Sequence, residues 1–205
     1  MGPLIVAGIK ISEDFKLKQI NVRDSKKIMP KKRAQLAEVI KEIADNYQIL
    51  VIPASDIDDM RKVMTLNEIE VNAFKKIIDE LKPDICYVDS ADVNEVRFGN
   101  NILSKLSFKP VIISKHKADE RYPVVGAASI IAKTRRDKEI RKIEQELKKK
   151  FNLPLGSGYP ADPITQKFLK KWVKTFGKLP PHTRCSWSTA RRILKENSMK
   201  KLDDF

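Results

Sequence analysis

A chain of 205 residues can bury a substantial core, and its 41% hydrophobic and 33% charged residues are typical of a soluble globular protein. No apolar run reaches the roughly 18 residues of a membrane-spanning helix, and the N-terminus lacks the basic lead of a secretory signal. We therefore expect neither a membrane-spanning helix nor a signal peptide. The only two cysteines, Cys86 and Cys185, argue against a disulfide scaffold and favour a reducing, cytoplasmic location. The net charge of +14 favours a polyanionic partner such as nucleic acid.

Short apolar runs alternate with helical patterns through the first half of the chain. The predicted strands cover residues 4–11, 49–52, 85–88 and 111–113. Pro30 opens a predicted helix, and Ser55 caps a short acidic one. Thr65 and Glu68 form the capping box of a third helix, which Pro83 stops. This alternation indicates an α/β fold.

Helical patterns dominate from Pro123 onward, where a long and increasingly charged helix follows the last strand. A further helix is capped by Asp162 and closed by Gly177. We therefore predict an α/β domain over residues 1–150 and a small helical appendage over 151–205.

Two predicted strands end in carboxylates. Asp89 follows the strand at 85–88, and Asp119 lies in the polar segment after the strand at 111–113, with one helix-sized segment between them. Consecutive parallel strands joined by a helix would bring both carboxylates to the same edge of one sheet. Paired carboxylates without a Cys or His cage suit a hard cation such as Mg²⁺ or Mn²⁺.

Four motifs, in order, carry a resemblance to a known family. They are RDSKK at 23–27, YVDSADV at 87–93, HKADERYPVVGAASIIAK at 116–133 and GSGYPADP at 156–163. Together they resemble type 2 ribonuclease H, ribonuclease HII, of the archaeal kind. The resemblance implies a ribonuclease-H-like mixed sheet flanked by helices. It also implies two-metal hydrolysis, with Mn²⁺ or Mg²⁺, of the RNA strand of RNA–DNA hybrids, including ribonucleotides embedded in DNA.

The resemblance assigns roles to individual residues. Asp89 and Asp119 match metal-binding, catalytic carboxylates, and Ser25 and Lys26 match a loop that grips a substrate phosphate. Tyr159 matches a tyrosine that stacks on the deoxyribose after an RNA–DNA junction. The expected partner is a hybrid duplex or DNA containing ribonucleotides, bound by a monomer away from any membrane.

Other polar or aromatic residues in the motifs have simpler interpretations. We expect Asp92 and Asp137 to be caps or ion-pair partners, and His116 to position its loop. Trp172 and Trp187 are expected in the core.

The chain departs from the family at its first residues. The family begins with a central strand ending in Asp-Glu-Ala-Gly-Arg-Gly, which supplies two further metal carboxylates, whereas this chain starts at Met1 in a segment that resembles the one just downstream. We therefore expect that the native product begins upstream and that the sheet lacks its first central strand. The 205-residue chain should be weakly active or inactive, because Asp89 and Asp119 alone offset only half of the charge of two divalent cations.

Three functions remain to be distinguished. The first is a hybrid-specific endonuclease, and the second is a non-catalytic basic nucleic-acid-binding protein derived from the same family. A structural RNA-binding protein of the ribosomal type is the third, but it leaves two acidic strand ends in a strongly basic chain unexplained.

Overall fold

The structure is a computed structural model that describes residues 1–20, 22 and 29–203, with side chains up to residue 199. The chain forms two compact units, each built from separate stretches of sequence. Unit 1 comprises Met1–Leu4, Ile52–Val63 and Arg136–Phe205, and unit 2 comprises Ile5–Val51 and Met64–Arg135. The functional division at residue 150, into a catalytic part and a substrate-contacting appendage, stays a prediction.

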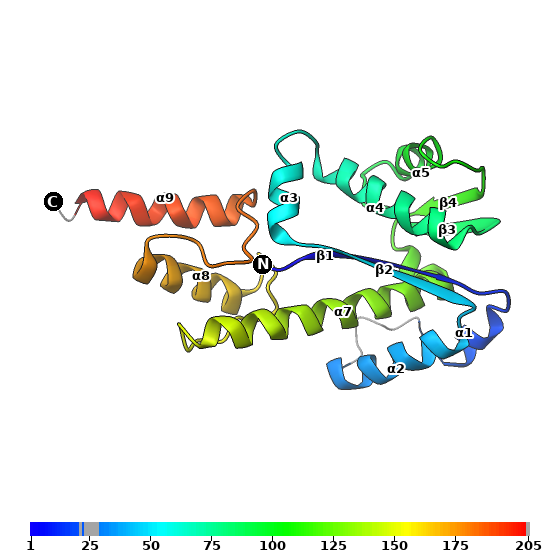
Figure 1. Cartoon of the computed structure of the whole chain (residues 1–205), viewed down its shortest axis with the longest axis horizontal. Helices are drawn as coiled ribbons and strands as arrows, with labels where there is room; N and C mark the ends of the chain where they lie inside the picture. The colour runs from blue at the N-terminus through cyan, green and yellow to red at the C-terminus, as the bar shows by residue number, and fades with distance from the viewer. Residues whose placement is uncertain (21, 23–28, 204–205) are drawn as a thin grey trace. The chain divides into compact units, whose positions relative to one another are not determined.

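The strands and most of the helices belong to unit 2. They are β1 (Leu4–Lys10), α1 (Phe15–Gln19), α2 (Pro30–Ile43), β2 (Asn46–Ile52), α4 (Leu66–Leu81), β3 (Ile85–Asp89), α5 (Glu95–Leu103), β4 (Val111–Lys115), α6 (Ala118–Arg121) and the first half of α7 (Pro123–Lys148). Unit 1 holds α3 (Ala54–Met60), the second half of α7, α8 (Pro163–Phe176) and α9 (Ser188–Asp203). The mixed α/β class predicted from the sequence is confirmed (Figure 1).

Local signals explain where most helices begin and end. The capping box of α4 is present, with Glu68 N donating to Thr65 Oγ1 and Thr65 N donating to Glu68 Oε2. The helix α8 begins after the Asp162 cap and ends at Gly177 in the left-handed conformation, as predicted. The prediction for Ser55 was wrong. Helix α3 begins at Ala54, two residues earlier than a Ser55 cap implies, with Pro53 as its N-cap. The Ser55 hydroxyl instead donates to the Asp56 carboxylate.

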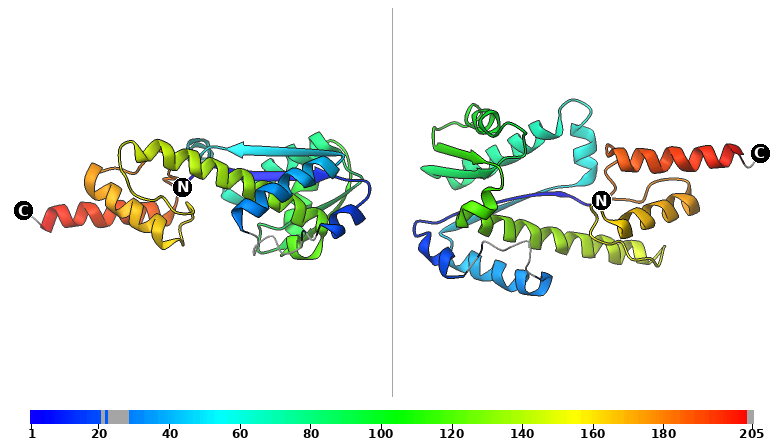
Figure 2. Two further views of the ribbon diagram at one scale, coloured as in Figure 1. Left: turned by 90° about the horizontal axis from the view of Figure 1, so that it is seen from below. Right: turned by 180° about the vertical axis from the view of Figure 1, so that it is seen from behind.

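The strands form two separate pairs among the described residues, β1 with β2 and β3 with β4 (Figures 1 and 2). Strands β3 and β4 are parallel, and Asp89 at the end of β3 lies opposite Lys115 at the end of β4. The sequence-predicted parallel neighbours are therefore confirmed. The four strands do not make one continuous sheet, because no described strand pairs with both β1 and β3.

Along the described part of the chain, β3 pairs with a strand on one side only, and this should be visible in hydrogen exchange. In the parallel ladder, Val111 N donates to Asp84 O and Ser90 N donates to Lys115 O. Alternate residues of a strand face the same neighbour, so the amides of Cys86 and Val88 face β4 and the amide of Tyr87 faces away. We expect the Tyr87 amide to exchange at least about tenfold faster than either neighbour, measured by NMR at neutral pH. Equal protection at all three amides would show that the second edge is covered.

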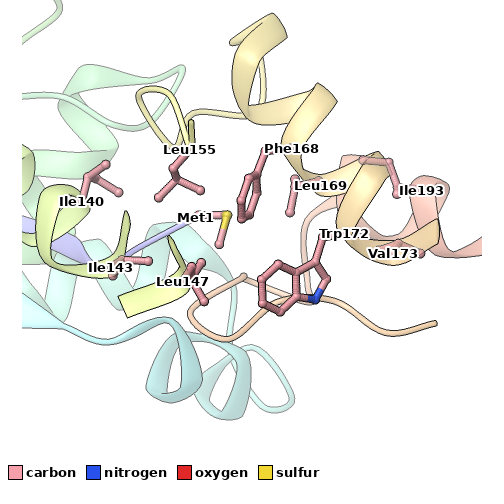
Figure 3. Packing of buried hydrophobic residues seen from close by; sticks show 10 residues of the cluster. All are labelled: Met1, Ile140, Ile143, Leu147, Leu155, Phe168, Leu169, Trp172, Val173 and Ile193. Atoms are coloured by element: carbon pink, nitrogen blue, oxygen red, sulfur yellow. The ribbon is translucent and has the colours of Figure 1, made fainter. Parts of the chain in front are cut away.

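Each unit has its own hydrophobic core. In unit 1 the buried Met1 side chain lies among residues of α7, α8 and α9 (Figure 3). Trp172 of α8 belongs to this cluster, as predicted, whereas Trp187 is only half-buried, with the Arg184 guanidinium 5.3 Å from its ring centroid. In unit 2, one cluster packs α7 against α2 and β1, and another packs α4 and α5 against β3.

Candidate active site and nucleic-acid interface

Asp89 ends β3, and Asp119 lies in α6 directly after β4, so the two residues lie at neighbouring strand ends. After β4 the chain turns through Lys117, which adopts the left-handed conformation at φ 53°, and enters α6. Asp89 Oδ1 accepts a hydrogen bond from Ala118 N at 3.0 Å, so the end of β3 is tied to the residue preceding Asp119. The parallel pairing and this bond place both carboxylates at one edge of unit 2.

Asp119 lies in a confined environment. Its side chain is only 7% exposed, and Lys133 Nζ of α7 lies 3.8 Å from its Oδ2 atom. The first turn of α7 packs closely behind it, since a Cβ at Gly126 would lie 3.0 Å from Asp119 O and 3.1 Å from Val22 O. Gly126, in the first turn of this helix, permits the close approach because it has no side chain.

The loops after β3 and β4 are joined by Glu95 and His116. Glu95 Oε1 accepts from Lys115 Nζ at 2.6 Å, and Glu95 Oε2 accepts from His116 N at 3.0 Å. The imidazole Nε2 of His116 lies 3.2 Å from Val93 O. These bonds lower the pKa of Glu95 below its ordinary value, first through Lys115 and then through the His116 amide. The contacts of His116 are those of a residue that positions its loop.

Asp92 serves the structure of the first loop. It accepts from Arg97 Nε at 2.9 Å and from Asn94 N at 2.9 Å. The Arg97 guanidinium and the Asn94 amide lower the pKa of Asp92 to about 2. The predicted role as an ion-pair partner is therefore confirmed. Asp137, for which the same role was predicted, lies within α7 and is partly exposed.

Hard oxygen donors at this edge fit a divalent cation, but they are few. Among the described residues, no group of three or more His, Cys, Asp or Glu side chains could hold a metal ion. Asp89 and Asp119 would supply two carboxylates, and Lys133 stands close to one of them. The donor set suits Mg²⁺ or Mn²⁺ rather than a thiophilic metal.

A second candidate region, the glycine-rich loop of residues 155–162, lies in unit 1. Gly156 and Gly158 have φ values of 76° and 75°, which favour glycine. The Asp162 carboxylate caps α8 and accepts from both the amide and the hydroxyl of Ser157, each at 2.6 Å. These bonds lower the pKa of Asp162 to about 2. Asp162 therefore ties the loop to the start of α8.

Three further bonds fix the same loop. Thr165 Oγ1 donates to Leu155 O at 2.8 Å and accepts from Gly158 N at 2.9 Å, and Gln166 Nε2 donates to Pro160 O at 2.7 Å. Tyr159 is nevertheless 50% exposed. The loop thus presents an aromatic ring from a firmly held backbone.

Some of the site could not be anticipated, and some lies outside the described residues. Ser25 and Lys26, predicted to grip a phosphate, fall in the part of the chain that the structure does not describe. Sequence reasoning missed Glu95 and Arg136. Glu95 sits in the first turn of a helix capped by Asn94, where an acidic residue is unremarkable, and Arg136 sits in a charged run that favours a solvated helix face.

The fold is that of a ribonuclease. The structure is similar to the ribonuclease H2 of Pyrococcus horikoshii OT3, with a TM-score of 0.81 and 38% identity over 96% of this chain and 94% of that one. It is also similar to the Archaeoglobus fulgidus structure of a PCNA:RNase HII complex, with a TM-score of 0.84 and 40% identity over 100% of this chain and 94% of that one. A Bst-RNase HIII solved with Mn²⁺ shares the fold alone, at a TM-score of 0.75 and 18% identity, over 97% and 66% of the two chains.

The sequence narrows the class to one family. The model of the family described as Ribonuclease HII matches residues 1–190. Ribonuclease HII of Methanosarcina barkeri is 48% identical over 96% of this chain and 90% of its own length, and that of Thermococcus sibiricus is 45% identical over 100% and 92%. The chain belongs to the ribonuclease HII family. Along the described residues, no helix combines the length and apolar character needed to cross a membrane.

Proposed function

We propose that the chain is an endonuclease that hydrolyses the RNA strand of RNA–DNA hybrids, including ribonucleotides embedded in DNA, with Mn²⁺ or Mg²⁺. The observation that carries the proposal is the joining of Asp89 and Asp119 at one edge of unit 2 by a parallel strand pair. Membership of the family and a net charge of +14 support a nucleic-acid substrate.

Asp89 and Asp119 would hold the metal. When bound, a divalent cation activates water and stabilises the charge that develops on the phosphate oxygens. The chain's own residues orient the ligands: the Ala118 amide fixes one oxygen of Asp89, and α7 packs behind Asp119. Lys133 places a positive charge beside Asp119, which offsets the carboxylate when no cation is present.

A two-metal mechanism requires more negative charge at the site than two carboxylates provide. Two divalent ions about 4 Å apart repel each other strongly, by a multiple of the ~4 kcal/mol between unit charges at that distance in an effective dielectric of 20. Asp89 and Asp119 offset only half of the total charge. We therefore propose that substrate phosphates complete the second site and that the 205-residue chain cleaves slowly.

A non-catalytic nucleic-acid-binding protein is the second candidate, favoured by the small number of carboxylates that the described residues bring to the site. The two functions separate when a labelled RNA–DNA hybrid is incubated with the chain in Mn²⁺, in Mg²⁺ and in a chelator. Metal-dependent appearance of 5′-phosphorylated fragments supports the nuclease. Tight binding without any cleavage above background in either metal would establish the second candidate.

Binding should be dominated by phosphate contacts, because the positive charge is large. If about five phosphates are neutralised, the logarithm of the association constant should fall against the logarithm of salt concentration with a slope near −4.5. The proposed phosphate contact of Lys26 predicts that Lys26→Ala reduces the magnitude of this slope by about one. Fluorescence anisotropy in chelator measures both slopes, and a slope near zero would contradict this mode of binding.

A further inference from the structure

The ring of Tyr159 is exposed, yet the loop beneath it is packed tightly against α7. A Cβ at Gly158 would lie 2.6 Å from Ile140 Cδ1 and 3.2 Å from Met1 O, so the loop approaches the helix as closely as glycine permits. Asp162, Thr165 and the backbone bonds described above fix the remainder of the loop. The backbone of Tyr159 is therefore set before any ligand arrives, and only its side-chain torsions remain to be restrained.

Arg136 of α7 supplies that restraint. Its guanidinium carbon lies 3.8 Å from the centroid of the Tyr159 ring, the distance of a stacked cation–π pair. Two further contacts hold the guanidinium in place, since Nη1 donates to Ser157 O at 2.9 Å and Nη2 to Met1 O at 3.3 Å. Burial lowers the pKa of Arg136 somewhat, although a guanidinium remains charged at neutral pH.

One face of the Tyr159 ring is occupied by a fixed cation. The planar guanidinium stacks on one face and is itself anchored to the backbone carbonyls of Ser157 and Met1. The Tyr159 residue as a whole remains 50% exposed despite this contact. An aromatic face that is exposed, and backed by a fixed cation on the other side, can stack on a sugar or base at little cost in side-chain entropy.

We infer that Arg136 is a positioning residue that fixes the ring plane of Tyr159 and thereby sets the preference for an RNA–DNA junction over plain hybrid. The inference rests on the proposed function, in which Tyr159 contacts the substrate beyond the ribonucleotide. Arg136 itself touches no substrate in this account. Arg136 affects the substrate preference only through Tyr159. The effects of substitutions at the two positions on this preference should therefore not be additive.

A merely structural role for Arg136 makes a different prediction. If its bonds to Ser157 and Met1 served only to hold unit 1 together, its loss would lower stability and weaken action on every substrate alike. A positioning role instead changes the ratio between two substrates. Arg136→Met removes the charge and the fork of donors while keeping the aliphatic stem, and Arg136→Lys keeps the charge but loses the planar stack.

The test compares two duplexes in Mn²⁺, one with a single ribonucleotide in DNA and one with a continuous RNA strand on DNA. For each, kcat and KM are measured with the unchanged chain, Arg136→Met, Arg136→Lys, Tyr159→Ala and the double variant. Arg141→Met is the matched control, because Arg141 is an exposed arginine of the same helix. Thermal melts establish that each variant is folded. If Arg136→Met does not fold, Arg136→Lys takes its place in the comparison.

We expect Arg136→Met to lower the junction-to-hybrid ratio of kcat/KM by about tenfold. The change should match that of Tyr159→Ala and appear mainly in KM for the junction, and the double variant should be no worse. Arg141→Met should leave the ratio unchanged. An equal loss on both duplexes, or a double variant showing the product of the two single effects, would overturn the inference.

Binding to the same duplexes in Ca²⁺ separates this inference from the proposed function. If the unchanged chain cleaves neither duplex, the proposed function fails, while the ratio of the two dissociation constants still reports on Tyr159 and Arg136. A ratio lowered equally by Arg136→Met and Tyr159→Ala supports the positioning role. A ratio that only Tyr159→Ala changes overturns it.

Discussion

Replacing either Asp89 or Asp119 by asparagine should reduce metal-dependent cleavage of a hybrid duplex by orders of magnitude. Each change keeps the shape of the side chain but removes one of the two negative charges that are proposed to hold the metal. In Asp89→Asn the amide oxygen can still accept from the Ala118 amide, so the loop should stay in place while its affinity for a cation falls. Single-turnover cleavage in saturating Mn²⁺ and Mg²⁺ measures the effect.

The double variant provides the stricter test of the pair. Residues that share one metal site are non-additive, so the chain with both Asp89→Asn and Asp119→Asn should be little worse than the worse single variant. Asp84→Asn is the matched control, since Asp84 is an exposed carboxylate at the opposite end of the same strand. Calorimetric titration with Mn²⁺ should show weakened binding for both site variants and none of this weakening for the control. Full activity in either single variant would exclude a shared metal site.

The placement of Asp89 and Asp119 at neighbouring strand ends could be predicted because it follows from local patterns. An apolar run, one helix-sized segment and a second apolar run specify parallel neighbours, and parallel neighbours end at the same edge. The capping box at Thr65 and the Asp162 cap were equally readable, because capping involves residues two or three positions apart. The division of the strands into two separate pairs depends on which strand edges meet. The sequence of a single strand does not determine this.

Arg136 could not be found in the same way. Its neighbours in sequence are charged, and the pattern favours a solvated helix face. Its partners, by contrast, lie at Ser157, Tyr159 and Met1, more than twenty positions along the chain in one direction and more than a hundred in the other. The two compact units illustrate the same limit, since unit 1 gathers three stretches that are far apart in sequence. Contacts of this kind are set by packing, which depends on the whole unit.

When the 205-residue chain is produced with Met1 as its first residue, its free α-amino group should make the stability of that chain depend on pH. Its N–H donates to Gly158 O inside the core of unit 1, and burial, followed by the charges of Arg184 and Arg136, lowers its pKa from 8.0 to about 4. In the unfolded chain the pKa returns to about 8, so between pH 4 and pH 8 unfolding takes up a proton. The free energy of unfolding should therefore fall as the pH is lowered from 8, by up to about 5 kcal/mol at pH 4.

Urea unfolding at several pH values between 5.5 and 8 measures this effect. In that window the carboxyl groups whose pKa the fold lowers, Asp92 and Asp162 among them, are ionised in both states and add no slope. A chain extended by Gly-Ser before Met1 carries a peptide N–H at Met1 and keeps every other titrating group, while its free α-amino group moves to the added glycine, two residues before Met1. We expect the extended chain to lose most of the slope, because a peptide N–H can donate to Gly158 O without ever taking up a proton. The same slope in both chains would show that other groups cause the pH dependence and that the amine is ionised in the folded protein.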